Sequence, residues 1–129
     1  MPGRARAVWV LLVVPLLAAC QSQAAPAPSG GSPSGAAATG KQLFVSKGCI
    51  ACHRAPGVPE AQGTIGPNLR GEGDPTGHPQ IAGAIPNTPE NMVRWLLNPP
   101  AVKPGTAMPN LGLSTDEAQS LAAFVETLK

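Results

Sequence analysis

The apolar residues of the chain fall into three stretches with helical spacing, separated by long irregular segments. The clearest stretch lies at the carboxyl end, where Ser114 to Glu117 has the spacing of a capping box. Apolar residues then recur three and four positions apart, namely Ala118, Leu121, Ala122, Val125 and Leu128. This pattern predicts an amphipathic helix that packs on a core and carries no chemistry of its own.

Two further helices are expected upstream. Thr88-Pro89-Glu90 combines a cap residue, a proline at the first helical position and an acidic residue in the first turn. Asn98-Pro99-Pro100 should end this helix. Its apolar face holds Met92, Trp95 and Leu96. A shorter helix is predicted over residues 40–47, and no segment alternates polar and apolar residues as a strand does. The expected fold is therefore all-α, with three main helices.

Residues 54–87 form a long segment rich in glycine and proline. The whole chain has 16 Pro and 15 Gly but only two Phe, two Trp and no Tyr. A domain of roughly 90 residues with few large side chains is marginal for burying a core of its own. An irregular segment of this length is also uncommon in a compact domain unless it wraps something. Both features predict a bound group in the interior.

The amino-terminal residues are separable from the fold. Arg4 and Arg6 precede an apolar run over residues 7–19, which has the pattern of an export signal and is too short for a comfortable bilayer crossing of about 20 residues. The run ends in Leu17-Ala18-Ala19-Cys20, which resembles the lipobox of bacterial lipoproteins. An ordinary signal peptide, cut at a later small residue, is the alternative.

The resemblance to a lipobox implies a signal peptide over residues 1–19 and acylation of Cys20. Residues 21–39 carry no charge and consist of small and polar residues and proline, so residues 20–39 are expected to be a lipidated cysteine followed by a disordered linker. The folded domain would then span residues 40–129. These features predict an exported protein, anchored by lipid on the periplasmic or outer face of a bacterial membrane.

The formal net charge of the chain falls to about zero when the predicted leader is left out. The chain has nine Lys and Arg against seven Asp and Glu. Because Arg4 and Arg6 lie in the leader, the remaining basic residues equal the acidic ones in number. Nothing in this balance favours a nucleic acid as partner.

The segment GCIACH, residues 48–53, places two cysteines and a histidine within a few positions of one another. A thioredoxin-like redox pair would need a parallel sheet behind Cys49 and Cys52, and a zinc site would need His53 and the distant His78 as further ligands. A plain disulfide would leave His53 without a role. Covalent attachment of haem uses both thiols and the histidine, with His53 as an axial iron ligand, and also supplies the missing interior. We therefore expect one covalently bound haem c.

The other axial ligand would decide the function, because an iron bound on both sides mainly passes electrons. Met92 is expected in the core and His78 in a solvated loop. Met108 lies in KPGTAMPN, residues 103–110, where two prolines and a glycine make a stiff non-helical strap. A thioether is a soft ligand that favours Fe(II), so Met108 is the predicted second axial ligand.

These motifs together resemble a class I cytochrome c over most of residues 40–129. Gly40 and Phe44 match the first helix of that family, residues 66–69 (GPNL) match the loop after the haem-binding motif, and Met108-Pro109 matches the methionine strap. The resemblance implies a small fold with long Gly/Pro-rich loops around one haem. It also implies that the carbonyl of Pro67 accepts a hydrogen bond from His53 and orients it.

Residues 85–114 are similar, more narrowly, to the cytochrome c domain fused to subunit II of some haem-copper oxidases. That similarity implies that Trp95 lies beside a haem propionate; a plain core tryptophan is the alternative. Phe124-Val125 stands where many relatives have Tyr-Leu, and no copper-binding domain precedes the haem domain. The chain is thus expected to be a separate carrier rather than the oxidase subunit.

The expected function is electron transfer, not catalysis, with a quinol-oxidising complex as donor and a terminal oxidase as acceptor. Lys41, Lys47 and Arg54 lie near the attachment site as a possible docking rim or as solvated charges. One alternative is a haem subunit bound permanently within a larger oxidoreductase. A gas-binding or peroxidatic haem protein is the other, and it would require an open iron site.

Overall fold

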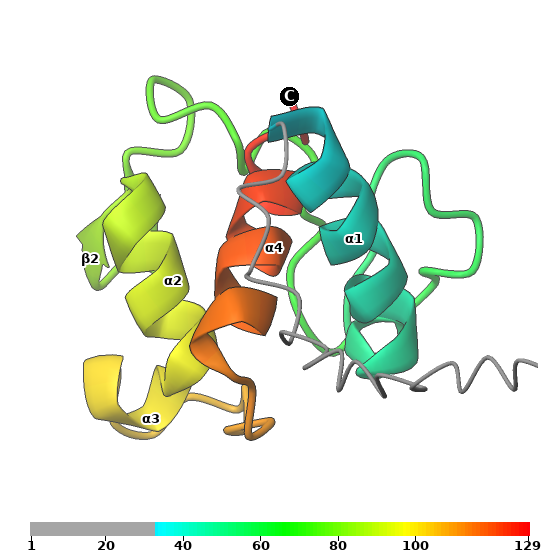
Figure 1. Cartoon of the computed structure of the whole chain (residues 1–129). Helices are drawn as coiled ribbons and strands as arrows, with labels where there is room; N and C mark the ends of the chain where they lie inside the picture. Colours follow the sequence, from blue (N-terminus) through cyan, green and yellow to red (C-terminus); the bar gives the residue numbers. More distant parts are fainter. Residues whose placement is uncertain (1–32) are drawn as a thin grey trace, which may run out of the picture.

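The structure is a computed structural model, and it describes residues 33–129. The predicted leader and Cys20 lie outside the described residues. The described chain contains α1 (Pro33–Ser46), α2 (Pro89–Leu97), α3 (Pro99–Val102) and α4 (Thr115–Val125), a 3₁₀ turn η1 (Cys49–Ala51), and two short strands, β1 (Gln80–Ile81) and β2 (Ile85–Pro86). Figure 1 shows α4 between α1 and α2, and α4 makes contacts with both.

The packing of α1 on α4 requires a residue without a side chain at the crossing. A Cβ atom at Gly40 would collide with the backbone carbonyl of Ser120 and lie 2.8 Å from Cβ of Phe124. Beside this crossing the rings of Phe44 and Phe124 meet in a tilted pair with centroids 5.5 Å apart. Gly40 therefore lets the first and last helices approach closely, and the aromatic pair fills the space next to them.

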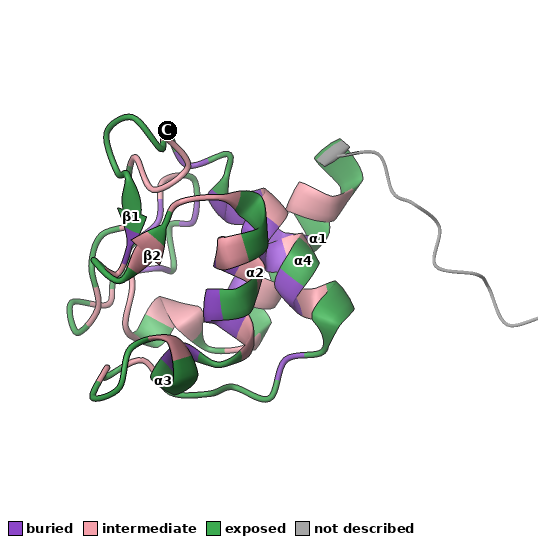
Figure 2. Cartoon of the chain, turned by 90° about the vertical axis from the view of Figure 1, so that its left-hand side faces the viewer, coloured by how far each residue is buried: buried purple, intermediate pink, exposed green. Residues whose placement is uncertain are grey.

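Buried residues gather on α4 and on the helices α1 and α2 that pack against it (Figure 2). Met92, Trp95 and Leu96 of α2 and Ala118 and Leu121 of α4 belong to one buried cluster. The apolar faces that the spacing predicted for these two helices are confirmed. None of the helices described over residues 33–129 is long and apolar enough to span a membrane.

The capping signals of α2 and α4 are present as predicted. The Thr88 hydroxyl accepts from the backbone N–H of Asn91, and Pro89 follows at the first helical position. Ser114 and Glu117 form a reciprocal capping box at the start of α4. Asn98 ends α2, but its side chain also accepts from the N–H of Ala101 and so begins α3.

The expectation of three helices without strands was incomplete in two places. α3 is a fourth, short helix, because prolines that stop one helix are suited to the first turn of the next. β1 and β2 pair as an antiparallel hairpin in which Ile81 lies opposite Ile85. Ala82 and Gly83 have positive φ angles of 52° and 65° at its turn. Strands of two residues are too short to produce an alternating pattern.

The first helix also begins earlier than predicted. α1 starts at Pro33 rather than Gly40, so residues 33–39 are helical instead of belonging to a disordered linker. Three consecutive alanines in this stretch have the highest intrinsic helix propensity. Ala36 and Ala37 are half-buried, so this additional turn is part of the folded domain.

Candidate functional site

The two cysteines and the histidine lie in one compact turn that follows α1. Gly48 adopts a positive φ of 80°, which reverses the chain after the helix. The N–H groups of Cys52 and His53 both donate to the carbonyl of Cys49, at 3.1 and 2.9 Å. Cys49 and Cys52 are half-buried free thiols. The turn thus holds two thiols and an imidazole within a few residues of one another.

The protonation of His53 follows from its backbone partner. Nδ1 of His53 lies 2.9 Å from the carbonyl oxygen of Pro67. Because a carbonyl only accepts, Nδ1 is the nitrogen that carries the proton. Nε2 hydrogen-bonds none of the described residues, so in the neutral ring its lone pair is available to a metal. His53 is therefore oriented and held in the tautomer that a metal ligand needs.

The loop that carries Pro67 is fastened to the cysteine turn at successive residues. The N–H of Gly66 donates to the carbonyl of Cys52 at 2.8 Å, and the N–H of Leu69 donates to the carbonyl of Arg54 at the same distance. A Cβ atom at Gly66 would lie 2.5 Å from Cε1 of His53. The long irregular segment is thus ordered by backbone bonds on both sides of the imidazole.

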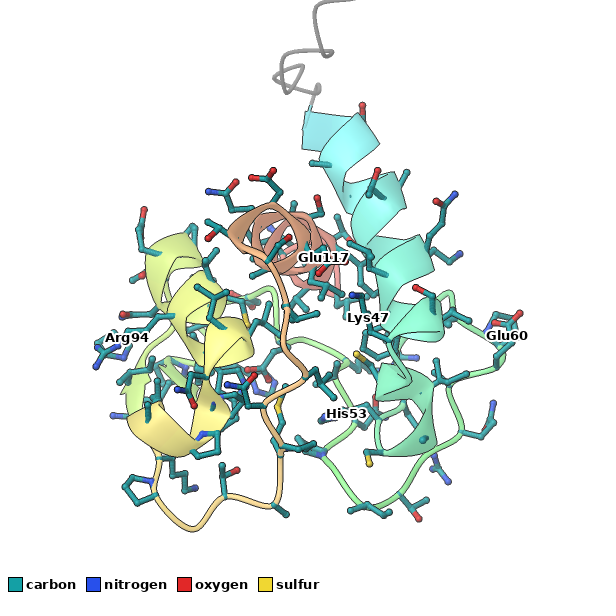
Figure 3. The ribbon with its side chains drawn as sticks, turned by 60° about the horizontal axis from the view of Figure 1, so that its bottom comes forward. Lys47, His53, Glu60, Arg94 and Glu117 are labelled. Carbon is teal, nitrogen blue, oxygen red and sulfur yellow. The ribbon has the colours of Figure 1, made fainter. Side chains whose placement is uncertain are left out.

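Met108 lies on the connection between α3 and α4. Lys103, at the start of this connection, donates from Nζ to the carbonyl of Ala82 at 2.7 Å, which ties the connection to the β1–β2 turn. The N–H of Met108 donates to the Thr106 hydroxyl, and the Met108 side chain is partly buried against the core. In Figure 3, His53 lies between the segment that follows α1 and this connection.

The other candidate ligands are placed elsewhere. Met92 is only 5% exposed within the core, as its spacing predicted. His78 is an exposed loop residue whose Nδ1 lies 3.6 Å from a carboxylate oxygen of Glu72. Trp95 is 8% exposed and belongs to the same core cluster as Met92. No hydrogen bond joins the Trp95 side chain to another residue of the described part. Since that part contains no fully buried side-chain nitrogen or oxygen without a partner, the indole N–H is not fully buried.

The geometry does not favour the other uses of a cysteine pair. Among residues 33–129, no group of three or more His, Cys, Asp and Glu side chains could hold a metal ion, so the zinc alternative lacks its ligand set. Burial raises the pKa of the Cys49 thiol, whereas a redox pair of the thioredoxin kind depends on a lowered thiol pKa. The two described strands pair in an antiparallel hairpin, and they form the only sheet within residues 33–129, so the parallel sheet that a thioredoxin-like pair needs is absent from this part of the chain.

A family comparison decides between these uses. The cytochrome c family model matches residues 37–129. The chain belongs to the cytochrome c family. Cytochromes c transfer electrons by means of haem, and they attach it through a Cys-x-x-Cys-His motif of the kind found at residues 49–53.

Three curated relatives are cytochrome c oxidase subunits 2. Those of Alkalihalophilus pseudofirmus, Bacillus sp. PS3 and Bacillus subtilis are each 33% identical to this chain, over 91, 94 and 94 residues. The matches cover 70% of this chain but only about a quarter of each relative: 25%, 25% and 26%. No solved structure matches the chain. The sequence similarity to the haem domain of oxidase subunit II is thus confirmed.

The donor set of the cysteine turn fits a covalently held haem. It offers two free thiols, a histidine with Nε2 available and, on the connection before α4, a half-buried thioether. Gly63 and Gly66 contribute to the site by having no side chain, which lets the loop lie close to the cysteine turn and to His53; the sequence did not reveal this role. A Cβ atom at Gly63 would collide with the backbone of Ala51 and Cys52. Glycine in a Gly-rich loop gives no local signal of such a distant contact.

The sequence also missed the ion pair of Lys47. Lys47 was interpreted as a docking or solvated charge, but its Nζ lies 2.6 Å from Oε1 of Glu117. Oε2 of Glu117 accepts from the N–H of Ser114, so one carboxylate caps α4 and binds the end of α1. The Lys47 ammonium group is therefore paired with a carboxylate of the same molecule.

Proposed function

We propose that the protein is a membrane-tethered cytochrome c that carries single electrons on one covalently attached haem. When bound, the haem supplies a one-electron Fe(III)/Fe(II) couple. Cys49 and Cys52 would hold the ring by thioether bonds, and His53 and Met108 would be its axial iron ligands. In this role no residue of the chain exchanges a proton with a substrate, so the protein is a carrier rather than an enzyme.

The hydrogen bond between His53 and Pro67 carries the proposal. It fixes the imidazole with the proton on Nδ1, which leaves Nε2 free to bind iron. A hydrogen bond of this kind also increases the electron donation of the imidazole to a metal. Because Gly66 has no side chain, the loop leaves room for the imidazole in this orientation; a Cβ atom at this position would displace the ring.

Met108 and Trp95 complete the proposed site. Met108 contributes a soft, neutral thioether, which stabilises Fe(II) and raises the reduction potential. The half-burial of Met108 and the tie of its connection to Ala82 through Lys103 support a fixed position for this ligand. The unpartnered indole N–H of Trp95 makes it a suitable donor to a haem propionate.

The membrane tether and the partners rest on the sequence and on the relatives. An acylated Cys20 would hold the protein on the periplasmic or outer face of a bacterial membrane, because the chains of a multiply acylated protein do not readily leave the bilayer. The relatives are subunits of cytochrome c oxidase. We therefore infer a terminal oxidase as electron acceptor and a quinol-oxidising complex as donor.

A permanent subunit of a larger oxidoreductase is the second candidate. The observation that favours it is that each relative carries the similar domain as part of a longer oxidase subunit. Purification in mild detergent separates the two candidates. A free carrier elutes alone, whereas a subunit elutes with stoichiometric partner chains.

Absorption spectra of the oxidised and reduced protein, prepared in a host that attaches haem c, test the axial ligands. The wild type should be low-spin, with the weak long-wavelength band of an Fe–S bond when oxidised. Met108→Ala should lose this band and show a lower potential, whereas Met92→Leu, which changes a core methionine, should keep both. A high-spin wild type that readily binds carbon monoxide would overturn the ligand assignment and favour a gas-binding protein.

A further inference from the structure

A cavity of about 270 Å³, widely open to solvent, lies on the segment that follows the cysteine turn. Neither His53 nor Met108 lines it, so it is distinct from the proposed haem site. Its polar lining comes from Arg54, Gln62, Asn68 and Arg70, and its apolar wall includes the buried Ala55 and Val58. We refer to it as the Arg54–Arg70 cavity.

Backbone pairing brings these polar residues together from separate parts of the loop. Arg54 forms an antiparallel bridge with Gln62 and a parallel bridge with Asn68. The side-chain oxygen of Asn68 accepts a hydrogen bond from the backbone N–H of Arg70 at 3.1 Å, which holds the backbone of Arg70 beside Asn68. The fold of the loop thus sets the backbone positions of both arginines beside the cavity, and their exposed side chains extend from there.

The charges of the cavity are unbalanced. Neither the Arg54 nor the Arg70 guanidinium forms a hydrogen bond or ion pair with any residue of the described part, and no carboxylate lines the cavity. Two of the three arginines within residues 33–129 therefore lie at one place in a domain whose basic and acidic residues are equal in number. Glu60 lies on the same loop, but Figure 3 shows it at the outer edge, and it does not line the cavity.

We propose that the Arg54–Arg70 cavity binds a phosphate group. Guanidinium groups form paired hydrogen bonds with oxyanions. A carboxylate presents one such pair and one negative charge, whereas a phosphate group presents enough oxygens for two guanidinium groups and can carry a second charge. The Asn68 side-chain amide, whose oxygen is already used by Arg70, adds a further donor. The ligand is either free phosphate or the phosphomonoester headgroup of an anionic lipid, phosphatidic acid.

Phosphate titration of the haem-loaded full-length protein, solubilised in a non-ionic detergent and kept reduced, tests the site. Backbone amide resonances of residues 54–70 should shift with saturation when inorganic phosphate replaces chloride at constant ionic strength. Arg54→Gln and Arg70→Gln should each weaken binding by about tenfold, because each removes charged hydrogen bonds. Arg94→Gln is the matched control, since Arg94 is exposed on α2, on the opposite side of Figure 3 from Glu60 and its loop.

A second titration with glycerol 3-phosphate, the water-soluble headgroup of phosphatidic acid, identifies the source. Saturation by inorganic phosphate alone assigns the site to free phosphate, and saturation by the headgroup assigns it to a lipid. Glu60→Gln should strengthen either interaction, because it removes a competing negative charge from the loop. The proposal is overturned if neither titrant saturates, or if Arg94→Gln weakens binding as much as the cavity variants. Binding does not depend on the axial ligands, so this outcome is independent of the electron-transfer proposal.

Discussion

His53 is held by backbone atoms on two sides, at the carbonyl of Pro67 and at Gly66. The sequence could predict the first contact only through the resemblance of residues 66–69 to a family motif. It could not predict the second, because the closeness of Gly66 to the ring depends on the bond between Gly66 and Cys52. Spacing thus predicts candidate ligands such as His53, whereas the backbone contacts that orient its ring are found only in the structure.

The contact at Gly66 leads to a prediction at this scale. In Gly66→Ala the new Cβ atom would lie 2.5 and 2.7 Å from Cε1 and Nδ1 of His53, so the ring or the loop must move. We expect a loss of about 1–3 kcal/mol in the free energy of unfolding, together with a shift in the reduction potential. Chemical denaturation and redox titration measure the two effects.

Gly77→Ala is the control for that substitution. A Cβ atom at Gly77 meets Asp74 only at 3.5 Å, which is ordinary contact, and its φ angle is not in the left-handed region. This variant should match the wild type in both measurements. If Gly66→Ala also leaves the potential unchanged, the loop does not control the orientation of His53.

At the scale of the elements, capping residues correctly predicted where helices begin, whereas composition did not predict that residues 33–39 are helical. Thr88 and Ser114 marked the starts of α2 and α4 because a capping side chain bonds a backbone group only a few residues away. The alanine-rich residues 33–39 of α1 carry no capping signal, although Ala36 and Ala37 are half-buried in the fold. The crossing of α1 on α4 is also a distant contact, which depends on Gly40.

A paired substitution in α1 tests this crossing. Gly40→Ala should destabilise the haem-loaded protein by roughly 3 kcal/mol or more, because the new methyl group collides with Ser120 and forces the two helices apart. Gly35→Ala, in the same helix, meets nothing within 4 Å. Since alanine favours a helix over glycine by roughly 0.5–1 kcal/mol, this variant should be as stable as the wild type or slightly more so in thermal unfolding.

The ion pair between α1 and α4 makes stability depend on pH. The Lys47 ammonium group, together with the N–H of Ser114, lowers the pKa of Glu117 below its usual 4.5. A lowered folded-state pKa stabilises the protein above the unfolded value, and this contribution is lost as the pH falls through the folded-state value. The wild type should therefore lose stability below about pH 4.5 partly through Glu117.

Glu117→Gln isolates this contribution, because glutamine still suits the capping box but carries no charge. Denaturant midpoints measured at neutral pH and at successively lower pH should fall less steeply for this variant than for the wild type. Thr76 lowers the pKa of Asp74 in the same direction, so part of the pH dependence should remain. An unchanged slope in Glu117→Gln would mean that the pair with Lys47 does not contribute in solution.

At the scale of the whole molecule, the sequence predicts a leader that precedes the folded domain. The family match begins at residue 37, close to the predicted domain boundary. The composition predicts a marginal core short of large side chains, yet the helices bury a continuous apolar cluster that includes both phenylalanines. Composition underestimated this core because small residues such as Ala118 and Ala122 fill space between closely packed helices.

The proposed tether gives the prediction for the whole molecule. Acyl chains on Cys20 would each contribute roughly 0.8 kcal/mol per buried CH₂ group, enough with more than one chain for stable attachment. The mature wild type should thus fractionate with membranes, and mass spectrometry should find Cys20 as a diacylated first residue. Cys20→Ala should lose the acyl mass while its haem spectrum stays unchanged, because the heme-binding motif begins at Cys49. A wild-type amino terminus that is unmodified and lies beyond Cys20 would instead identify an ordinary signal peptide and a freely diffusing carrier.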